Sequence, residues 1–290
     1  MKRILVIGSG DIARRAIALL TPHFRVFALV RRSQAMAALR ALGAVPIRGD
    51  LDDRRSLARL AGTADAVLHF APPPASGDGV DARTRHFLAA LGSRRSLPQR
   101  LVYISTTGVY GDCGGAVIDE TRPCRAGSVR AQRRLDAERA LRAFGRRRHV
   151  AVSILRAPGI YAAGRLPLER LQRGDPVPEA GACAFTNHIH ADDLARLAVA
   201  ALFRARAGRL YNAVDDSRIT AGDWFDLVAD THGLPHPPRL PWPQLRQHLS
   251  PLALSFLQAS RRIENRRIKR ELGFRLRYPT VVHGLAALQT

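Results

Sequence analysis

Short apolar and β-branched runs alternate with segments of helical periodicity through the first half of the chain. The apolar runs cover residues 4–7, 25–30, 45–47, 66–70, 101–105 and 152–155. Between the first four runs, residues 12–20, 33–42 and 56–60 place apolar side chains on one helical face and arginines on the other. Strands that alternate with crossover helices predict βαβ units and a parallel sheet.

The pattern changes after Pro158, where loops with proline and glycine break the periodicity. We therefore expect a first domain over residues 1–160 and a smaller lobe over residues 161–290, with one more strand near 209–213 returning to the first domain. Residues 191–201 and 221–231 have helical patterns. The tail from 249 to 272 is also expected to be helical, with Gly273 as its C-cap.

A glycine-rich turn, Gly8-Ser9-Gly10-Asp11-Ile12-Ala13, follows the first predicted strand and opens the first predicted helix. In that context a G-x-G-x-x-G/A pattern indicates dinucleotide binding, because the glycines admit a pyrophosphate that the helix N-terminus attracts. Ala13 takes the third, packing position. The alternative is a turn that binds nothing. We favour an α/β fold, a Rossmann-type doubly wound parallel sheet with a smaller C-terminal substrate lobe.

The residues after the second strand bear on the choice of cofactor. An acidic residue there normally receives the ribose hydroxyls, whereas this chain has Arg31 and Arg32. Two guanidiniums can bind a 2′-phosphate through charge-assisted hydrogen bonds, so NADP(H) is favoured over NAD(H). The alternative is that both arginines are solvated and bind no cofactor. Asp50 and Leu51, which follow the third strand, are expected beside the adenine. Further candidate cofactor contacts follow the fourth strand, at Ala71 and Pro72.

The net charge of +22 would by itself suggest nucleic acid as a partner. Almost all of the positive charge is arginine, however, since lysine occurs only at positions 2 and 269, and the arginines are spread along the whole chain. No helix-turn-helix signature, zinc finger or basic arm with interleaved aromatic residues is present. We therefore do not expect nucleic-acid binding.

The number and spacing of the cysteines indicate a reducing compartment. The three cysteines have neither close-pair metal spacing nor an even count for a disulfide framework. His188 and His190 precede Asp192 and Asp193, but an acidic pair before an apolar helix is better explained by helix capping and first-turn charge, so no metal is predicted. Neither a signal-peptide core nor a membrane span is evident. A cytoplasmic protein that does not contact membranes is expected.

Several further segments carry a resemblance to a known family. They are Tyr103-Ile104-Ser105-Thr106-Thr107-Gly108-Val109-Tyr110-Gly111, Asp119-Glu120-Thr121-Arg122-Pro123, Arg156-Ala157-Pro158-Gly159-Ile160-Tyr161, His188-Ile189-His190-Ala191-Asp192-Asp193-Leu194 and Arg270-Glu271-Leu272-Gly273. With the glycine turn, they resemble the extended short-chain dehydrogenases/reductases and their NAD(P)-dependent epimerase/dehydratase-like relatives over nearly the whole chain.

That resemblance implies a hydride-transfer site in which a Ser/Thr hydroxyl and a tyrosine contact the substrate oxygen. A lysine four residues after the tyrosine lowers its pKa in the family. Thr106 resembles the Ser/Thr member, but the Tyr-x-x-x-Lys pair is absent here. Counting back from Glu138, which resembles the acidic residue after the family's lysine, the expected tyrosine and lysine positions hold Arg130 and Arg134.

Both arginines share a helical stripe with Ala137 and Leu141, which suggests that they line the cleft. Because arginine keeps its proton, neither can act as a general acid or base, although either could bind an anion or stabilise an oxyanion. Solvated surface arginines are the alternative.

Tyr110, Tyr161 and His188 are the candidate substitutes for proton transfer. We prefer Tyr161, because the resemblance places its loop beside the nicotinamide and because Arg165, four residues on, could depress its pKa. Each of the three could instead be a packed core residue.

These observations favour an NAD(P)-dependent oxidoreductase or epimerase-like enzyme that acts on a hydroxyl or carbonyl group of a small polar substrate such as a nucleotide sugar. The alternative is a catalytically silent NADP(H)-binding sensor, and the missing Tyr-x-x-x-Lys pair is the feature that separates the two. The oligomeric state is left open, with a homodimer as one option.

Overall fold

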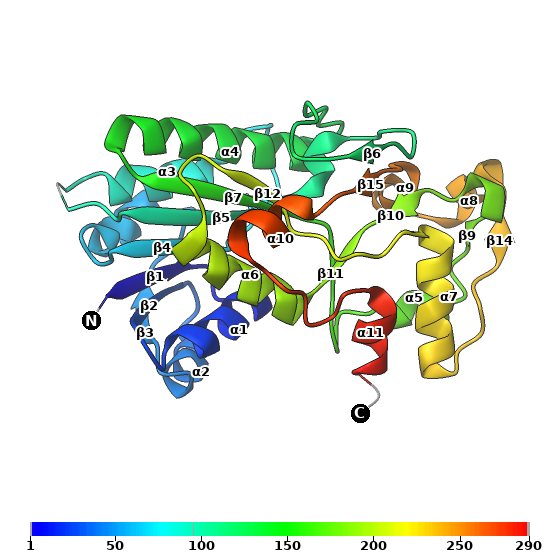
Figure 1. Ribbon diagram of the computed structural model, residues 1–290, viewed down its shortest axis with the longest axis horizontal. Coiled ribbons are helices and arrows are strands. Elements are labelled where there is room, and N and C mark those ends of the chain that lie inside the picture. The colour runs from blue at the N-terminus through cyan, green and yellow to red at the C-terminus, as the bar shows by residue number, and fades with distance from the viewer. Residues whose placement is uncertain (1, 95, 289–290) are drawn as a thin grey trace.

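A seven-stranded parallel sheet forms the centre of the molecule in a computed structural model that describes residues 2–94 and 96–288 (Figure 1). The strand order is β12-β7-β5-β4-β1-β2-β3. The strands are β1 (Arg3–Ile7), β2 (Arg25–Val30), β3 (Val45–Arg48), β4 (Ala66–His69), β5 (Arg100–Thr106), β7 (Ala151–Ala157) and β12 (Leu210–Asn212). This topology confirms the predicted doubly wound α/β fold.

Helices cover both faces of the sheet (Figure 1). One layer holds α1 (Asp11–Leu20), α2 (Gln34–Ala41) and α6 (Ala191–Arg204), and the other holds the short 3-10 helix η1 (Arg54–Leu60), α3 (Ala82–Leu91) and α4 (Val129–Arg148). Successive residues of β1 point to opposite faces, so Val6 enters the core under α1 and Leu5 enters the core under α3. Because both faces of the sheet are buried, the sequences of its strands are continuous apolar runs.

The smaller lobe is built from short paired strands and helices around its own apolar core, which includes Trp224, Phe225 and Leu245. Its strand pairs are β8 (Gly159–Tyr161) with β11 (His188–His190), β9 (Val177–Pro178) with β14 (Arg239–Leu240), and β10 (Phe185–Thr186) with β13 (Ile219–Thr220). Its helices are α5 (Leu168–Gln172), α7 (Ala221–His232), α8 (Trp242–His248), α9 (Pro251–Gln258) and α11 (Val281–Ala286), with the 3-10 turn η3 (Ala180–Ala182).

Three segments differ from the sequence expectations or extend them. The tail is not one helix: after α9 the chain forms β15 (Arg262–Ile263), which pairs with β6 (Val117–Ile118), before α10 (Arg266–Leu272) begins. Pairing with a distant strand therefore overrides the local helical pattern. Gly273 does cap α10, with φ of +57°. The strand expected near 209–213 is β12, and α6, which follows the assumed boundary at residue 160, packs against α1 on the sheet.

No helix in the described ranges is long and apolar enough to cross a membrane.

Candidate cofactor and active site

A cleft of about 360 Å³ opens at the carboxyl ends of β1, β4, β5 and β7. The strand order reverses between β1 and β4, and parallel sheets of this kind bind ligands at such a switch point. The cleft brings together nine of the residues proposed from the sequence: Gly8, Ser9, Gly10, Asp11, Ile12, Ala71, Pro72, Thr106 and Arg134. Its other lining residues include Phe70, Ser105, Pro158, Arg165 and Leu194.

The glycine turn fits a bound pyrophosphate. Gly8 has φ of +93°, and a Cβ atom there would lie 2.9 Å from the backbone nitrogen of Ala71, so a side chain is excluded. A Cβ at Gly10 would meet nothing within 4 Å, which shows open space on the cleft side of the turn. Gly10 also begins α1 without a side-chain cap, so the first N–H groups of the helix stay free for an anion. Ala13 is buried at the packing position.

Asp11 would stand close to that pyrophosphate, and two arginines neutralise it. Its carboxylate accepts a hydrogen bond from Arg15 Nε at 2.9 Å and pairs with Arg165 Nε at 2.8 Å. Arg165 is itself a lining residue of the cleft. From the sequence, Arg165 is expected only as a neighbour of Tyr161, because nothing in the local pattern indicates a partner so far away in the chain.

The residues proposed for the adenosine end lie beyond the lining of the cleft. Arg31 and Arg32 directly follow β2, are exposed, and have no ion-pair or hydrogen-bond partner for their guanidiniums within the described ranges. Asp50 Oδ1 accepts a hydrogen bond from the Asp52 backbone at 3.0 Å. The Leu51 side chain is buried in the core, and its carbonyl oxygen lies 2.8 Å from His86 Nδ1.

At the reaction end, Thr106 and Arg134 lie together in the cleft lining. The Thr106 hydroxyl accepts a hydrogen bond from the Gly108 N–H at 3.1 Å, which starts the 3-10 helix η2 (Thr107–Tyr110). Arg134 Nη1 donates to the Tyr103 hydroxyl at 2.9 Å and to the Ile104 carbonyl at 2.8 Å. Since a guanidinium has five N–H donors, several remain for a ligand.

Arg130 is not part of this lining. It is exposed, and its guanidinium lies 4.5 Å from the centre of the Phe256 ring on α9. Partial burial and the nearby charge of Arg134 lower the pKa of Arg130. The structure therefore places one of the two replacement arginines at the cleft and the other between α4 and the lobe.

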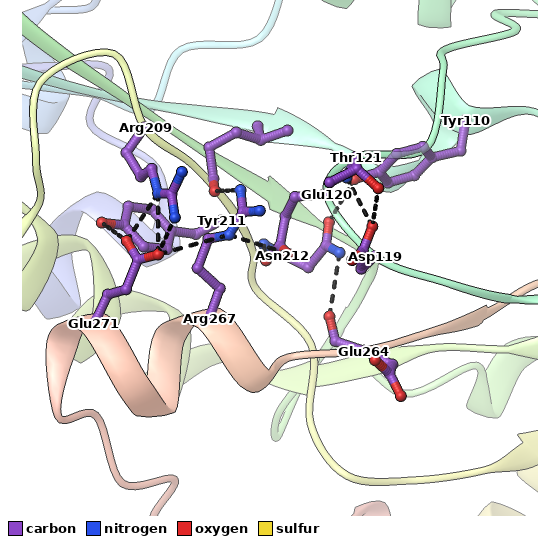
Figure 2. A network of polar contacts seen from close by, with 11 residues as sticks. Tyr110, Asp119, Glu120, Thr121, Arg209, Tyr211, Asn212, Glu264, Arg267 and Glu271 are labelled. Carbon is purple, nitrogen blue, oxygen red and sulfur yellow. Dashed lines mark hydrogen bonds and ion pairs between the residues drawn. The ribbon is translucent and has the colours of Figure 1, made fainter.

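Tyr110 does not line the cleft and belongs instead to a network of polar contacts (Figure 2). Its hydroxyl donates to Asn212 Oδ1 at 2.7 Å, and the Arg156 guanidinium lies 4.6 Å from its ring centre. The Asn212 backbone N–H in turn donates to Glu120 at 2.9 Å. Burial raises the pKa of Tyr110 to about 12.

Tyr161 is buried among the aromatic residues His188, His190 and Trp224 of the lobe, and its hydroxyl donates to the Thr280 carbonyl at 3.3 Å. Burial raises its pKa. The expectation that Arg165 depresses this pKa is wrong, because Arg165 pairs with Asp11 instead.

His188 is buried against Trp224, with ring centres 4.3 Å apart, and burial lowers its pKa to about 3. Its imidazole is therefore neutral at ordinary pH. His188, like Tyr110 and Tyr161, is absent from the residues that line the cleft.

A buried ion pair sets the position of α4 behind the cleft. Glu138 accepts hydrogen bonds from Arg156 of β7 at 2.7 and 3.0 Å and from the Ser105 hydroxyl of β5 at 2.6 Å. Both charged side chains are almost completely buried. This pair fixes the helix that carries Arg134 against the two strands whose ends form the cleft.

Residues 8–205, more than half of the chain, match a family of proteins described as NAD(P)H-binding. The chain belongs to the NAD(P)H-binding family. The match begins at the glycine turn and covers every strand of the sheet from β2 to β7. The glycine turn where the match begins lies in the cleft at the switch point, where sheets of this kind bind ligands.

Individual members and fold relatives are consistent with this assignment. A protein of unknown function from Silicibacter pomeroyi DSS is 32% identical, with a TM-score of 0.81 over 100% of this chain and 98% of that one. A candidate NAD-dependent epimerase/dehydratase from Methylobacillus flagellatus is 25% identical, with a TM-score of 0.74 over 99% and 97% of the two chains. The UDP-glucose 4-epimerase of Thermotoga maritima, solved with UDP-glucose, shares the fold at 18% identity and a TM-score of 0.78 over 99% and 97%.

A curated relative matches a shorter segment. The 4-hydroxy-2-methyl-3-oxo-4-farnesyl-3,4-dihydroquinoline-1-oxide ketoreductase of Stigmatella aurantiaca is 33% identical over 133 residues, which are 42% of this chain and only 39% of that protein. Epimerase, dehydratase and reductase relatives together support an NAD(P)-dependent oxidoreductase- or epimerase-like role for this member of the NAD(P)H-binding family. The resemblance seen in the sequence is confirmed.

Proposed function

We propose that this protein exchanges a hydride between NADP(H) and a hydroxyl or carbonyl group of a small polar substrate, with Arg134 contacting the reacting oxygen. The observation that carries the proposal is the position of Arg134 in the cleft lining beside Thr106, with N–H donors to spare. A nucleotide sugar is our preferred substrate class, supported by the UDP-glucose bound to the fold relative from Thermotoga maritima.

The nicotinamide would supply or accept the hydride, and the residues of this chain would manage the charge on the substrate oxygen. Arg134 donates hydrogen bonds to that oxygen and stabilises the negative charge that develops when a carbonyl is reduced. The Thr106 hydroxyl offers a second donor. Because arginine stays protonated, the proton that completes the alcohol comes from solvent, directly or through Thr106.

Turnover measurements on Arg134→Met test this assignment. Wild type, Arg134→Met and the control Arg139→Met are titrated with NADPH and NADH and assayed with a panel of nucleotide sugars and carbonyl compounds. Arg139 lies on the same helix, is exposed and lines no part of the cleft. Loss of an oxyanion donor should lower kcat of Arg134→Met by about 10² or more, with cofactor affinity little changed. Retention of wild-type kcat in Arg134→Met would refute the role of this residue.

One observation favours a second candidate function, a catalytically silent NADP(H) sensor. Among the described residues that line the cleft there is no tyrosine, histidine or lysine, the side chains that usually transfer protons to a substrate oxygen. The same experiment separates the candidates. Tight cofactor binding by wild type without hydride transfer to any compound in the panel would favour the sensor.

A further inference from the structure

The loop that connects β4 to α3 begins in the lining of the cleft and then leaves it, and it has little structure of its own. Ala71 and Pro72 at its start are lining residues. Residues 72–74 are consecutive prolines, Gly77 has φ of +98°, and residues 72–80 make no backbone-to-backbone hydrogen bond with any part of the described chain. Carbonyl groups in such a segment bind either water or side-chain donors from other elements.

Arg133 of α4 supplies those donors. Its guanidinium donates to the carbonyl oxygens of Asp78 at 2.6 Å, Pro74 at 2.9 Å and Ala75 at 3.0 Å, and also to that of Gly77. The residue is 5% exposed, and no carboxylate of the described chain pairs with it. Four carbonyl dipoles therefore replace water and a counter-ion around a buried positive charge.

Neighbouring contacts fix the two ends of the same loop. Asp136, one turn further along α4, accepts a hydrogen bond from the Asp81 N–H at 2.9 Å, where the loop ends and α3 begins. At the other end, Arg83 Nη1 donates to the Pro72 carbonyl at 3.4 Å while its guanidinium pairs with Asp52 at 2.6 Å. Within the described residues, the hydrogen bonds from other elements to the carbonyls of residues 74–78 all come from Arg133.

We propose that Arg133 is a positioning residue for cofactor binding: by holding the carbonyls of residues 74–78 it keeps the start of the loop, Ala71 and Pro72, in place in the cleft lining. Without the guanidinium the carbonyls would turn to water, and the loop would occupy several conformations. Binding of the dinucleotide would then have to select or order one of them, which weakens the observed affinity. The proposal rests on the cofactor binding assumed in the proposed function but not on the hydride-transfer step.

The adjacent residue Arg134 cannot take this role. Successive residues on a helix point about 100° apart, and here Arg134 turns to the cleft and to Tyr103 while Arg133 turns to the loop. Replacement of Arg133 should therefore change cofactor affinity, whereas replacement of Arg134 should change kcat.

Cofactor titration combined with limited proteolysis tests the proposal. NADPH dissociation constants and the rate of proteinase K cleavage within residues 75–80 are measured for full-length wild type, Arg133→Ala, Arg133→Lys and the exposed control Arg139→Ala. Arg133→Ala should bind NADPH about tenfold more weakly or worse and be cleaved faster in the loop, because it loses hydrogen bonds made by a charged group. Millimolar guanidinium ion should restore binding to Arg133→Ala, since the free ion matches the site that the side chain leaves, and should not affect Arg139→Ala.

Unchanged affinity and an unchanged rate of loop cleavage in Arg133→Ala would overturn the proposal, as would a weakened affinity that guanidinium ion fails to restore in a folded protein. If Arg133→Ala does not fold, Arg133→Lys tests the proposal instead, because a lysine keeps the positive charge but lacks the planar set of N–H donors of a guanidinium. Arg133→Lys should bind NADPH more weakly than wild type. Equal binding by the two proteins contradicts the proposal. Failure of wild type to bind NADPH or NADH is a separate result, which rejects the proposed function itself.

Discussion

Arginine side chains that are close in sequence have different surroundings in this protein. Arg133 is buried under four carbonyls, Arg134 lines the cleft, and Arg130 lies over an aromatic ring of the lobe. Arg31 and Arg32 make no hydrogen bond or ion pair through their guanidiniums in the described chain, although the Arg31 charge helps to lower the pKa of Asp52. Position, and not the abundance of arginine, is therefore what distinguishes a binding residue from a solvated one.

Replacement of Arg31 and Arg32 by serine should change the cofactor preference. A 2′-phosphate would lose its charge-assisted hydrogen bonds, so NADPH affinity should fall by about tenfold or more while NADH affinity stays within a factor of about two. Dissociation constants for both cofactors, measured in parallel with the exposed control Arg40→Ser, check this. An equal loss of affinity for NADPH and NADH would mean that the pair does not recognise the 2′-phosphate.

At the level of elements, the sequence predicts what is encoded locally. The strands of the sheet and the helices α1 and α2 follow from runs and periodicities. The stripe on α4 predicts both Arg130 and Arg134 in the cleft, and only Arg134 lies there. The contacts of Arg133 were not predictable, because its acceptors lie 55 or more positions away. The surroundings of Tyr161 were not predictable for the same reason: packing between β8, β11 and α7 sets them, and no local pattern reveals it.

The buried pair between α4 and β7 should contribute strongly to stability. Glu138→Gln leaves the Arg156 charge buried without its counter-ion, so the free energy of unfolding should fall by about 3–5 kcal/mol. Urea denaturation of this variant measures the loss, with the exposed Glu169→Gln as the matched control. The double variant Glu138→Gln/Arg156→Met should recover part of it, because no uncompensated charge remains. Losses of equal size in the Glu138 and Glu169 variants would contradict this account of α4.

At the scale of the whole molecule, the sheet and the lobe are joined where β12 ends. The Asp215 N–H donates to the His188 carbonyl of β11 at 2.8 Å, and the Asp215 carboxylate accepts a hydrogen bond from the Ser217 N–H at 2.9 Å. Its other carboxylate oxygen is buried without a partner among the described residues. The junction therefore contains an acidic group that is poorly suited to carrying a charge.

Burial raises the pKa of Asp215 to about 7, above the value of about 3.9 for an exposed aspartate. The folded protein therefore binds a proton more readily than the unfolded chain, and the carboxyl destabilises the fold progressively as pH rises from about 4 to about 7. Asp215→Asn removes this ionisation, so its free energy of unfolding relative to wild type should increase by a few kcal/mol across that window and stay constant above it.

Buried histidines give stability the opposite dependence on pH. Burial lowers the pKa of both His69 and His188 to about 3, so the free energy of unfolding decreases as pH falls below about 6.5. That loss is common to wild type and Asp215→Asn, so it cancels in the difference between them. Urea denaturation of the two proteins at pH 4.5, 6 and 8 therefore isolates the contribution of Asp215. A difference that does not change with pH would show that the junction holds this carboxyl in an environment as favourable as water.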